Sequence, residues 1–253
     1  MADLPGAIAL VFAAGTVGGA MNALAGGGTF ATLPALIALG LPANVANATS
    51  NFALLPGACS SAWVYRDELR PLSGVSMPTL AMLTFIGGLA GGLLLVVTPT
   101  RAFDLIIPWL LLFAFMAMLM GKRASIWLRA RLTIGKTTLM LMQLLLGIYG
   151  GYFGGGIGLI TTAVYGLLTG VTVREMFAPR TLMLVTANLA AACIFLWFHM
   201  VDWLTCLPML TGAIAGGWLG AHVGKALPER LVRLWTLAVT AATTAVFFSR
   251  AYG

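Results

Sequence analysis

The chain has 253 residues, of which 60% are hydrophobic and 8% are charged, and its formal net charge is +7. Globular proteins carry roughly 25% charged residues, so a soluble domain is excluded and an integral membrane protein is predicted. The basic residues lie in short loops between apolar runs and form no extended basic face, which argues against nucleic acid as a partner.

Long apolar runs without ionisable residues predict an all-α fold, that of a polytopic helical membrane protein. No Lys, Arg, Asp, Glu or His occurs in residues 4–65, although a spanning helix needs only about 20 apolar residues. Transmembrane β-strands would instead read as alternating segments of about ten residues. Ten helical segments are predicted, at residues 5–25, 29–41, 45–64, 73–97, 103–121, 137–153, 157–169, 181–199, 204–223 and 231–248.

The second and seventh segments are too short to cross a typical bilayer upright. Each follows a cluster of glycines, so we expect each to be a half-helix or part of a re-entrant hairpin. The sequence therefore predicts eight to ten membrane segments. The chain begins without the basic region and cleavage site of a secretory signal, so the first segment is expected to remain a membrane helix.

The two halves of the chain resemble each other. The clearest match pairs the pattern Pro-x-Arg-x-x-x-Leu at 99–105 with the same pattern at 228–234. We therefore predict a first repeat of five segments at 1–121, a basic cytoplasmic linker at 122–136 and a second repeat of five segments at 137–253.

The distribution of Lys and Arg indicates how these repeats are oriented. If each repeat crosses the membrane an odd number of times, twelve of the fourteen basic residues share one side and only Arg101 and Arg250 lie on the other. An even number of crossings would divide them eight to six. The positive-inside rule favours the first arrangement. It predicts inverted repeats, with both termini outside and the linker in the cytoplasm.

Two glycine clusters interrupt otherwise apolar segments. The first comprises Gly26, Gly27 and Gly28 before Thr29, and the second lies at 154–158. A helix that begins after such a break directs free N–H groups and the positive end of its dipole toward the break, which suits an anion. In inverted repeats the two breaks are expected to face each other near the membrane midplane.

Polar residues accompany both breaks. Thr49, Ser50 and Asn51 interrupt the third segment, and Arg180 with Thr181 occupies the corresponding place in the second half. Arg180 could pair bidentately with a carboxylate or sulfonate, or could instead bind lipid headgroups at the cytoplasmic edge. The predicted substrate-binding residues are Asn22, Gly26, Gly27, Gly28, Thr29, Thr49, Ser50, Asn51, Gly154, Gly155, Gly156, Gly158, Arg180 and Thr181.

The sequence favours a secondary transporter over an enzyme. It contains no nucleotide-binding P-loop, no GxSG serine motif and no cluster of metal-ligating side chains within the apolar segments. We therefore predict no catalytic residue, no cofactor and no metal site. A divalent metal-ion permease and a non-transporting membrane scaffold are the alternatives.

Four motifs, in their order and spacing, give the chain a resemblance to a known family. They are GGGT at 26–29, ATSN at 48–51, YGGYFGGGIG at 149–158 and VDW at 201–203. Together they resemble the TauE/SafE family of sulfite exporters and organosulfonate permeases. The chain departs from the family pattern at Arg180, where many relatives carry a small Gly-Thr-Ser type stretch, and this leaves the substrate open.

The resemblance implies a multi-pass carrier of the bacterial inner membrane that moves a small sulfur-containing anion, most simply sulfite or an organosulfonate. The predicted inverted repeats imply alternating access around a midplane site within the lipid bilayer, and the resemblance suggests a homodimer. The direction of transport and the coupling ion are not indicated by the sequence.

Overall fold

The structure is a computed structural model, and it describes residues 4–129, 135–169 and 175–253. Within these ranges the chain is helical except for connecting loops, as the apolar runs predict. A short 3-10 turn, η1, lies at Arg66–Glu68. The helices are α1 Leu4–Leu24, α2 Thr29–Ala38, α3 Ala43–Tyr65, α4 Met77–Val97, α5 Thr100–Arg129, α6 Lys136–Tyr152, α7 Ile157–Thr169, α8 Phe177–Trp197, α9 Trp203–Ala226 and α10 Glu229–Tyr252.

The all-α, polytopic prediction is confirmed, and each of the ten predicted segments corresponds to one of these helices. The main difference is at α5, which runs to Arg129, whereas the sequence placed the end of that segment at 121. The basic stretch after 121 contains good helix formers such as Lys122 and Arg123, so the helix continues into the predicted linker.

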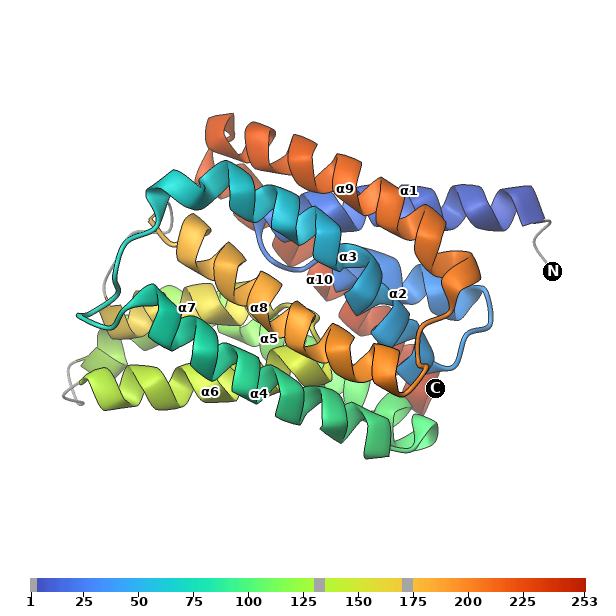
Figure 1. Cartoon of the computed structure of the whole chain (residues 1–253), viewed down its shortest axis with the longest axis horizontal. Coiled ribbons are helices and arrows are strands. Elements are labelled where there is room, and N and C mark those ends of the chain that lie inside the picture. The colour runs from blue at the N-terminus through green and yellow to red at the C-terminus, as the bar shows by residue number, and fades with distance from the viewer. Residues whose placement is uncertain (1–3, 130–134, 170–174) are drawn as a thin grey trace.

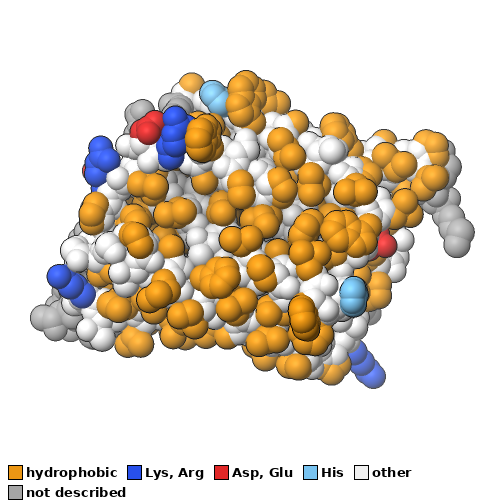
Figure 2. Space-filling view, viewed as in Figure 1, with side chains coloured by type: hydrophobic (Ala, Val, Ile, Leu, Met, Phe, Trp, Pro, Cys, Tyr) orange, Lys and Arg blue, Asp and Glu red, His pale blue; other side chains and the backbone are white. Residues whose placement is uncertain are grey.

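Six helices in the described part of the chain are long and apolar enough to cross a membrane: α1, α4, α8, α9, α10 and the Thr100–Ala117 part of α5. The remaining predicted segments do not meet this criterion by themselves. Helix α3 has 23 residues but contains the polar cluster at 49–51, α6 has 17 residues, and α2 and α7 are shorter. The protein is a multi-pass membrane protein, and large apolar side chains cover the face seen in Figure 2.

The helices run roughly along the long axis of the molecule (Figure 1). In that view α1, α3 and α9 run from right to left, and α4, α6 and α8 run from left to right. Helix α8 lies between α3 and α4 and packs against both. Both ends of the chain lie at the right-hand side.

Two helix pairs pack closely through glycines. On α1, a Cβ added at Gly15 would overlap the carbonyl oxygen of Met209 on α9. On α4, a Cβ at Gly91 would overlap the carbonyl oxygen of Ile148 on α6. Small residues allow helix backbones to approach closely in a membrane, where van der Waals packing takes over from the hydrophobic effect. These glycines therefore serve helix packing.

Candidate functional site

The two glycine breaks meet inside the protein. The first connects α1 to α2, the second connects α6 to α7, and residues of both are buried. The amide of Gly158 donates to the carbonyl oxygen of Gly26 at 3.2 Å. Gly26 has a φ of +76°, and a Cβ there would overlap the Cα of Gly158. The backbones of the two breaks are thus in direct contact, which only glycine allows.

Asn22 closes the first break. Its side-chain Oδ1 accepts a hydrogen bond from the amide of Gly28 at 2.6 Å, across the unwound residues. Gly28 in turn packs so closely against α1 that a Cβ would overlap the carbonyl oxygen of Gly18. Gly27 packs beside the ring of Phe30, and Thr29 is the buried first residue of α2. All five predicted residues of this region therefore lie at the break.

The second break is lined by polar groups from α3 and α6. Gly154 and Gly156 have φ values of +71° and +74°, so both adopt the left-handed conformation. The carbonyl oxygen of Gly155 accepts a hydrogen bond from the hydroxyl of Tyr149 at 2.8 Å. The side-chain amide of Asn51 lies against Gly154 and donates to Oδ1 of Asn188 on α8 at 3.4 Å.

Several backbone donors at the breaks remain free. Among the described residues, the structure gives no hydrogen-bond acceptor for the amides of Gly27, Gly154, Gly155 or Gly156. A buried amide without an acceptor is costly, and such donors near helix N-termini suit an anion. These four amides are therefore candidate donors to an anion.

Arg180 is buried in the protein beside the first break. Only 3% of the surface of this residue is exposed. The Nη2 group donates to the carbonyl oxygens of Ala23 at 3.1 Å and Leu24 at 3.2 Å, which are the last residues of α1. The guanidinium also lies 4.7 Å from the ring centroid of Phe177. Little of this side chain therefore faces the surface, where lipid headgroups would lie.

The charge of Arg180 has no carboxylate partner within the described part of the chain, where the ion pairs found involve other residues. Its Nε is buried and has no hydrogen-bond acceptor there. The C-terminal end of α1 contributes a partial negative charge of about half a unit. A buried cation of this kind is stabilised further when an anion approaches it.

Three predicted residues have partners that hold the fold together. Thr49 accepts a hydrogen bond from the backbone amide of Asp202 at 3.0 Å, at the loop before α9. The hydroxyls of Ser50 and Thr32 lie 2.5 Å apart and connect α3 to α2. Thr181 donates to the carbonyl oxygen of Phe177 within α8. These contacts favour structural roles for Thr49, Ser50 and Thr181.

The prediction of site residues missed three buried polar side chains that lie near those it included. Asn47 donates to the carbonyl oxygen of Tyr152, the last residue of α6, at 3.1 Å. Asn188 pairs with Asn51, and Thr161 lies in the second turn of α7 with an unpartnered hydroxyl. In the sequence, these residues differ from their neighbours only in having an amide or hydroxyl side chain within an apolar segment. Such a side chain usually indicates a buried contact between helices.

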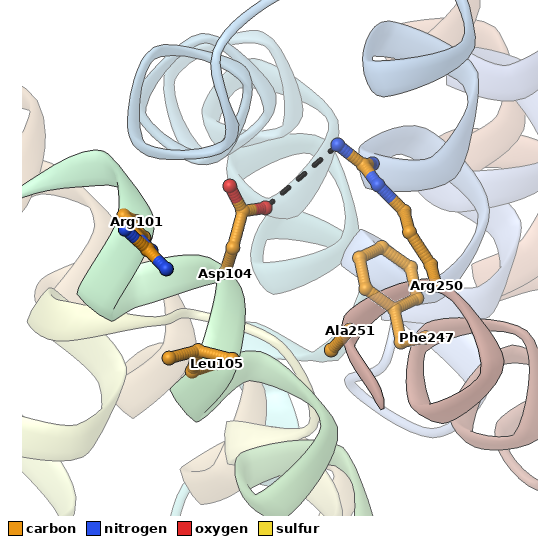
Figure 3. A pocket seen from close by; sticks show the side chains of 6 residues that line it. All are labelled: Arg101, Asp104, Leu105, Phe247, Arg250 and Ala251. Atoms are coloured by element: carbon orange, nitrogen blue, oxygen red, sulfur yellow. Dashed lines mark ion pairs between the residues drawn. The ribbon is translucent and has the colours of Figure 1, made fainter. Parts of the chain in front are cut away.

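A separate pocket of about 280 Å³ opens between the first turns of α5 and the end of α10. Figure 3 shows Asp104 between Arg101 and Arg250, with Phe247 and Leu105 below. The Nη2 of Arg250 lies 3.8 Å from Oδ1 of Asp104, and both side chains are partly exposed. The two arginines predicted to share the side of the membrane opposite the other basic residues therefore line one pocket.

The fold is that of a polytopic helical membrane protein. Its buried site contains polar residues and helices interrupted by glycines, which are features of transporters. The family model described as "Sulfite exporter TauE/SafE" matches residues 11–247. The chain belongs to this family, which is one of transporters and not of enzymes.

Curated relatives agree with this assignment. The chain is 28% identical over 238 residues to a probable membrane transporter protein of Haemophilus influenzae, covering 92% of this chain and 93% of that protein. It is 26% identical over 247 residues to the probable membrane transporter protein YfcA of Escherichia coli K12, covering 97% and 91% of the two chains. The probable membrane transporter protein ORF9 of a Sinorhizobium species is 27% identical over 227 residues, covering 89% and 86%. No solved structure gives a significant match.

Proposed function

We propose that this transporter carries a small sulfur-containing anion, sulfite or an organosulfonate, at the site where the two glycine breaks meet. The observation that carries the proposal is the buried guanidinium of Arg180, which has no carboxylate partner in the described residues and lies directly against the end of the first break. The family is described as one of sulfite exporters, which supports a sulfur-containing anion as the substrate class.

The chemistry of the site suits such an anion. A sulfonate or sulfite group has three acceptor oxygens and loses much hydration energy on entering a membrane protein, unless several donors replace water. Free amides of Gly27 and of 154–156 are available as donors, and Arg180 contributes positive charge. We assign the direct binding role to these groups and a supporting role to Asn22, which bonds across the first break, and to Asn51, which lies against Gly154 of the second.

We propose further that the two halves are inverted repeats that alternate between two orientations around this site. Corresponding helix pairs support this reading. In one half α1 and α3 both pack on α9, and in the other half their counterparts α6 and α8 both pack on α4. In each comparison the corresponding helices run in opposite directions in Figure 1. Opposed halves of this kind can exchange inward-facing and outward-facing states.

The proposed orientation places both termini outside the bacterial inner membrane. Arg101 and Arg250 line one pocket near the end of α10, whereas most Lys and Arg side chains visible in Figure 2 gather at the opposite end of the molecule. This separation is the one that the positive-inside rule requires if the more basic end is cytoplasmic. Homodimer formation stays a prediction from the family resemblance.

A divalent metal ion is a poorer match to this interior. The buried polar residues in the described part of the chain include Arg180 and no carboxylate or histidine. A cation with two charges binds best to carboxylates and imidazoles, and a neighbouring guanidinium would repel it.

The test is the thermal stability of the detergent-purified protein with sulfite, thiosulfate, sulfoacetate, taurine, sulfate or acetate, in a choline buffer. A bound anion at 100 times its dissociation constant should stabilise the protein by about 2.7 kcal/mol. We expect Arg180→Gln to lose this response and Arg70→Gln, at an exposed arginine of the α3–α4 loop, to keep it. An unchanged response and wild-type transport in Arg180→Gln would contradict the proposal, and a response to divalent cations alone would favour a metal permease.

A further inference from the structure

The two breaks differ in what meets the end of the preceding helix. At the first break, a permanent cation, the guanidinium of Arg180, binds the terminal carbonyl oxygens of α1. At the second break, the terminal carbonyl oxygen of α6 belongs to Tyr152, and it is met by the neutral amide of Asn47. Each helix end carries a partial negative charge, but only the first has a resident positive charge among the described residues.

Two unpartnered oxygens lie beside the second helix end. Tyr152 offers a carbonyl oxygen, which only accepts, so the amide nitrogen of Asn47 must face it and Oδ1 must point elsewhere. This oxygen has no hydrogen-bond partner, and neither does Oδ1 of Asn51. Asn47 is 0% exposed and Asn51 is 2% exposed, so bulk water does not reach either residue.

Both asparagines face the same region. They are one helical turn apart on α3 and therefore share a face of that helix. The Asn47 amide contacts the last carbonyl oxygen of α6, and the Asn51 amide lies against Gly154, two residues later. Gly154 is part of the unwound segment, in which the carbonyl oxygens of 154–156 accept hydrogen bonds, whereas none to that of Phe153 is found among the described residues. Two buried Oδ1 atoms without hydrogen-bond partners therefore belong to the face of α3 that meets the negative end of the α6 dipole.

We propose that a monovalent alkali cation binds here, to Oδ1 of Asn47 and Asn51 and to backbone carbonyl oxygens of the second break. Neutral amide and carbonyl oxygens at a broken helix are typical ligands for such an ion. A divalent ion would require carboxylates, and the buried residues described contain none. At the second break, the bound alkali cation supplies the positive charge that Arg180 supplies at the first break.

The cation site does not depend on the proposed transport function. Only the further step, that this cation is the coupling ion, rests on it. Arg180 and the alkali ion would together bring two positive charges to the site, which matches a doubly charged anion such as sulfite. Binding of the cation would then favour binding of the anion, and the favourable effect must be mutual.

The first experiment compares melting temperatures in LiCl, NaCl, KCl and choline chloride at equal ionic strength and without any substrate anion. We expect at least one alkali chloride to raise the melting temperature above that in choline chloride, with saturation at high concentration. The rise should vanish in Asn51→Leu. It should persist in Asn44→Leu, which changes an asparagine of the same helix whose Oδ1 already accepts hydrogen bonds from Val45 and Thr100. Equal melting temperatures in all four salts would overturn the proposal.

A second variant keeps the test decisive if Asn51→Leu does not fold. In Asn47→Asp, the carboxylate retains an oxygen ligand and adds a negative charge, but no longer donates to Tyr152. We expect this variant to melt at a lower temperature in choline chloride and to need at least about tenfold less alkali cation for half of the rise. An unchanged or weaker cation response in Asn47→Asp would contradict a cation site. Because the anion test of Arg180 is made in choline, it can succeed when this one fails.

Discussion

The contact between the two breaks can be tested by adding one methyl group at Gly26. This residue combines a φ of +76° with a close approach to Gly158. An alanine in the left-handed region costs roughly 1–2 kcal/mol. Its Cβ would also overlap the Gly158 backbone, and overpacking of a tight interior costs about 1–3 kcal/mol. Gly26→Ala is therefore expected to destabilise the protein by about 2–5 kcal/mol.

Gly40 provides the matched control. Its φ is +93°, but no atom lies within 4 Å of the position that a Cβ would take, in the exposed loop between α2 and α3. Gly40→Ala should therefore show the conformational cost alone, about 1–2 kcal/mol. The difference between the two variants, about 1–3 kcal/mol, isolates the contact between the breaks.

The assay is unfolding of the purified protein in mixed micelles by a titration with sodium dodecyl sulfate, followed by far-UV circular dichroism. Gly158→Ala should be destabilised by the same overlap, since a Cβ there meets the Cα of Gly26. Because the two sites touch, the effects of Gly26→Ala and Gly158→Ala should not add in the double variant. The reasoning is refuted if Gly26→Ala is no more destabilising than Gly40→Ala, or if the two effects add.

Two further predictions concern contacts away from the breaks. Gln143→Leu removes the side-chain oxygen that accepts from the Tyr165 hydroxyl at 2.7 Å and the amide that donates to Thr84 at 2.6 Å, both within the buried interior. Unfolding measurements should show a loss of about 1–3 kcal/mol, and a neutral effect would mean that these groups find other partners. Asp104→Asn should change the free energy of unfolding by less than about 1 kcal/mol, because its ion pair with Arg250 is partly exposed. A larger loss in the same assay would show that this pair holds α5 to α10.

The sequence predicted the positions of the ten helices found in the described residues because membrane helices are specified locally. A run of apolar residues of sufficient length has no alternative that satisfies its backbone in lipid. The glycine clusters at 26–28 and 154–156 likewise predicted the two helix breaks, because three adjacent glycines are poor helix formers in any context. At α5 the apolar pattern predicted where the hydrophobic segment ends but not where the helix ends, because the helix continues into the basic stretch to Arg129.

The roles of individual polar residues depended on the tertiary structure. Thr49 and Arg180 were both candidates in the sequence, yet Thr49 holds the loop before α9 and Arg180 lies against the end of α1. Asn188 carried no more signal than any polar residue in an apolar segment until its pairing with Asn51 was seen. A hydroxyl or amide can satisfy its hydrogen bonds with many partners, and residues 137 or more positions apart in the chain decide which one it finds. The local pattern therefore determines where the helices break, while the packing of distant helices determines which polar atoms remain free to bind an ion.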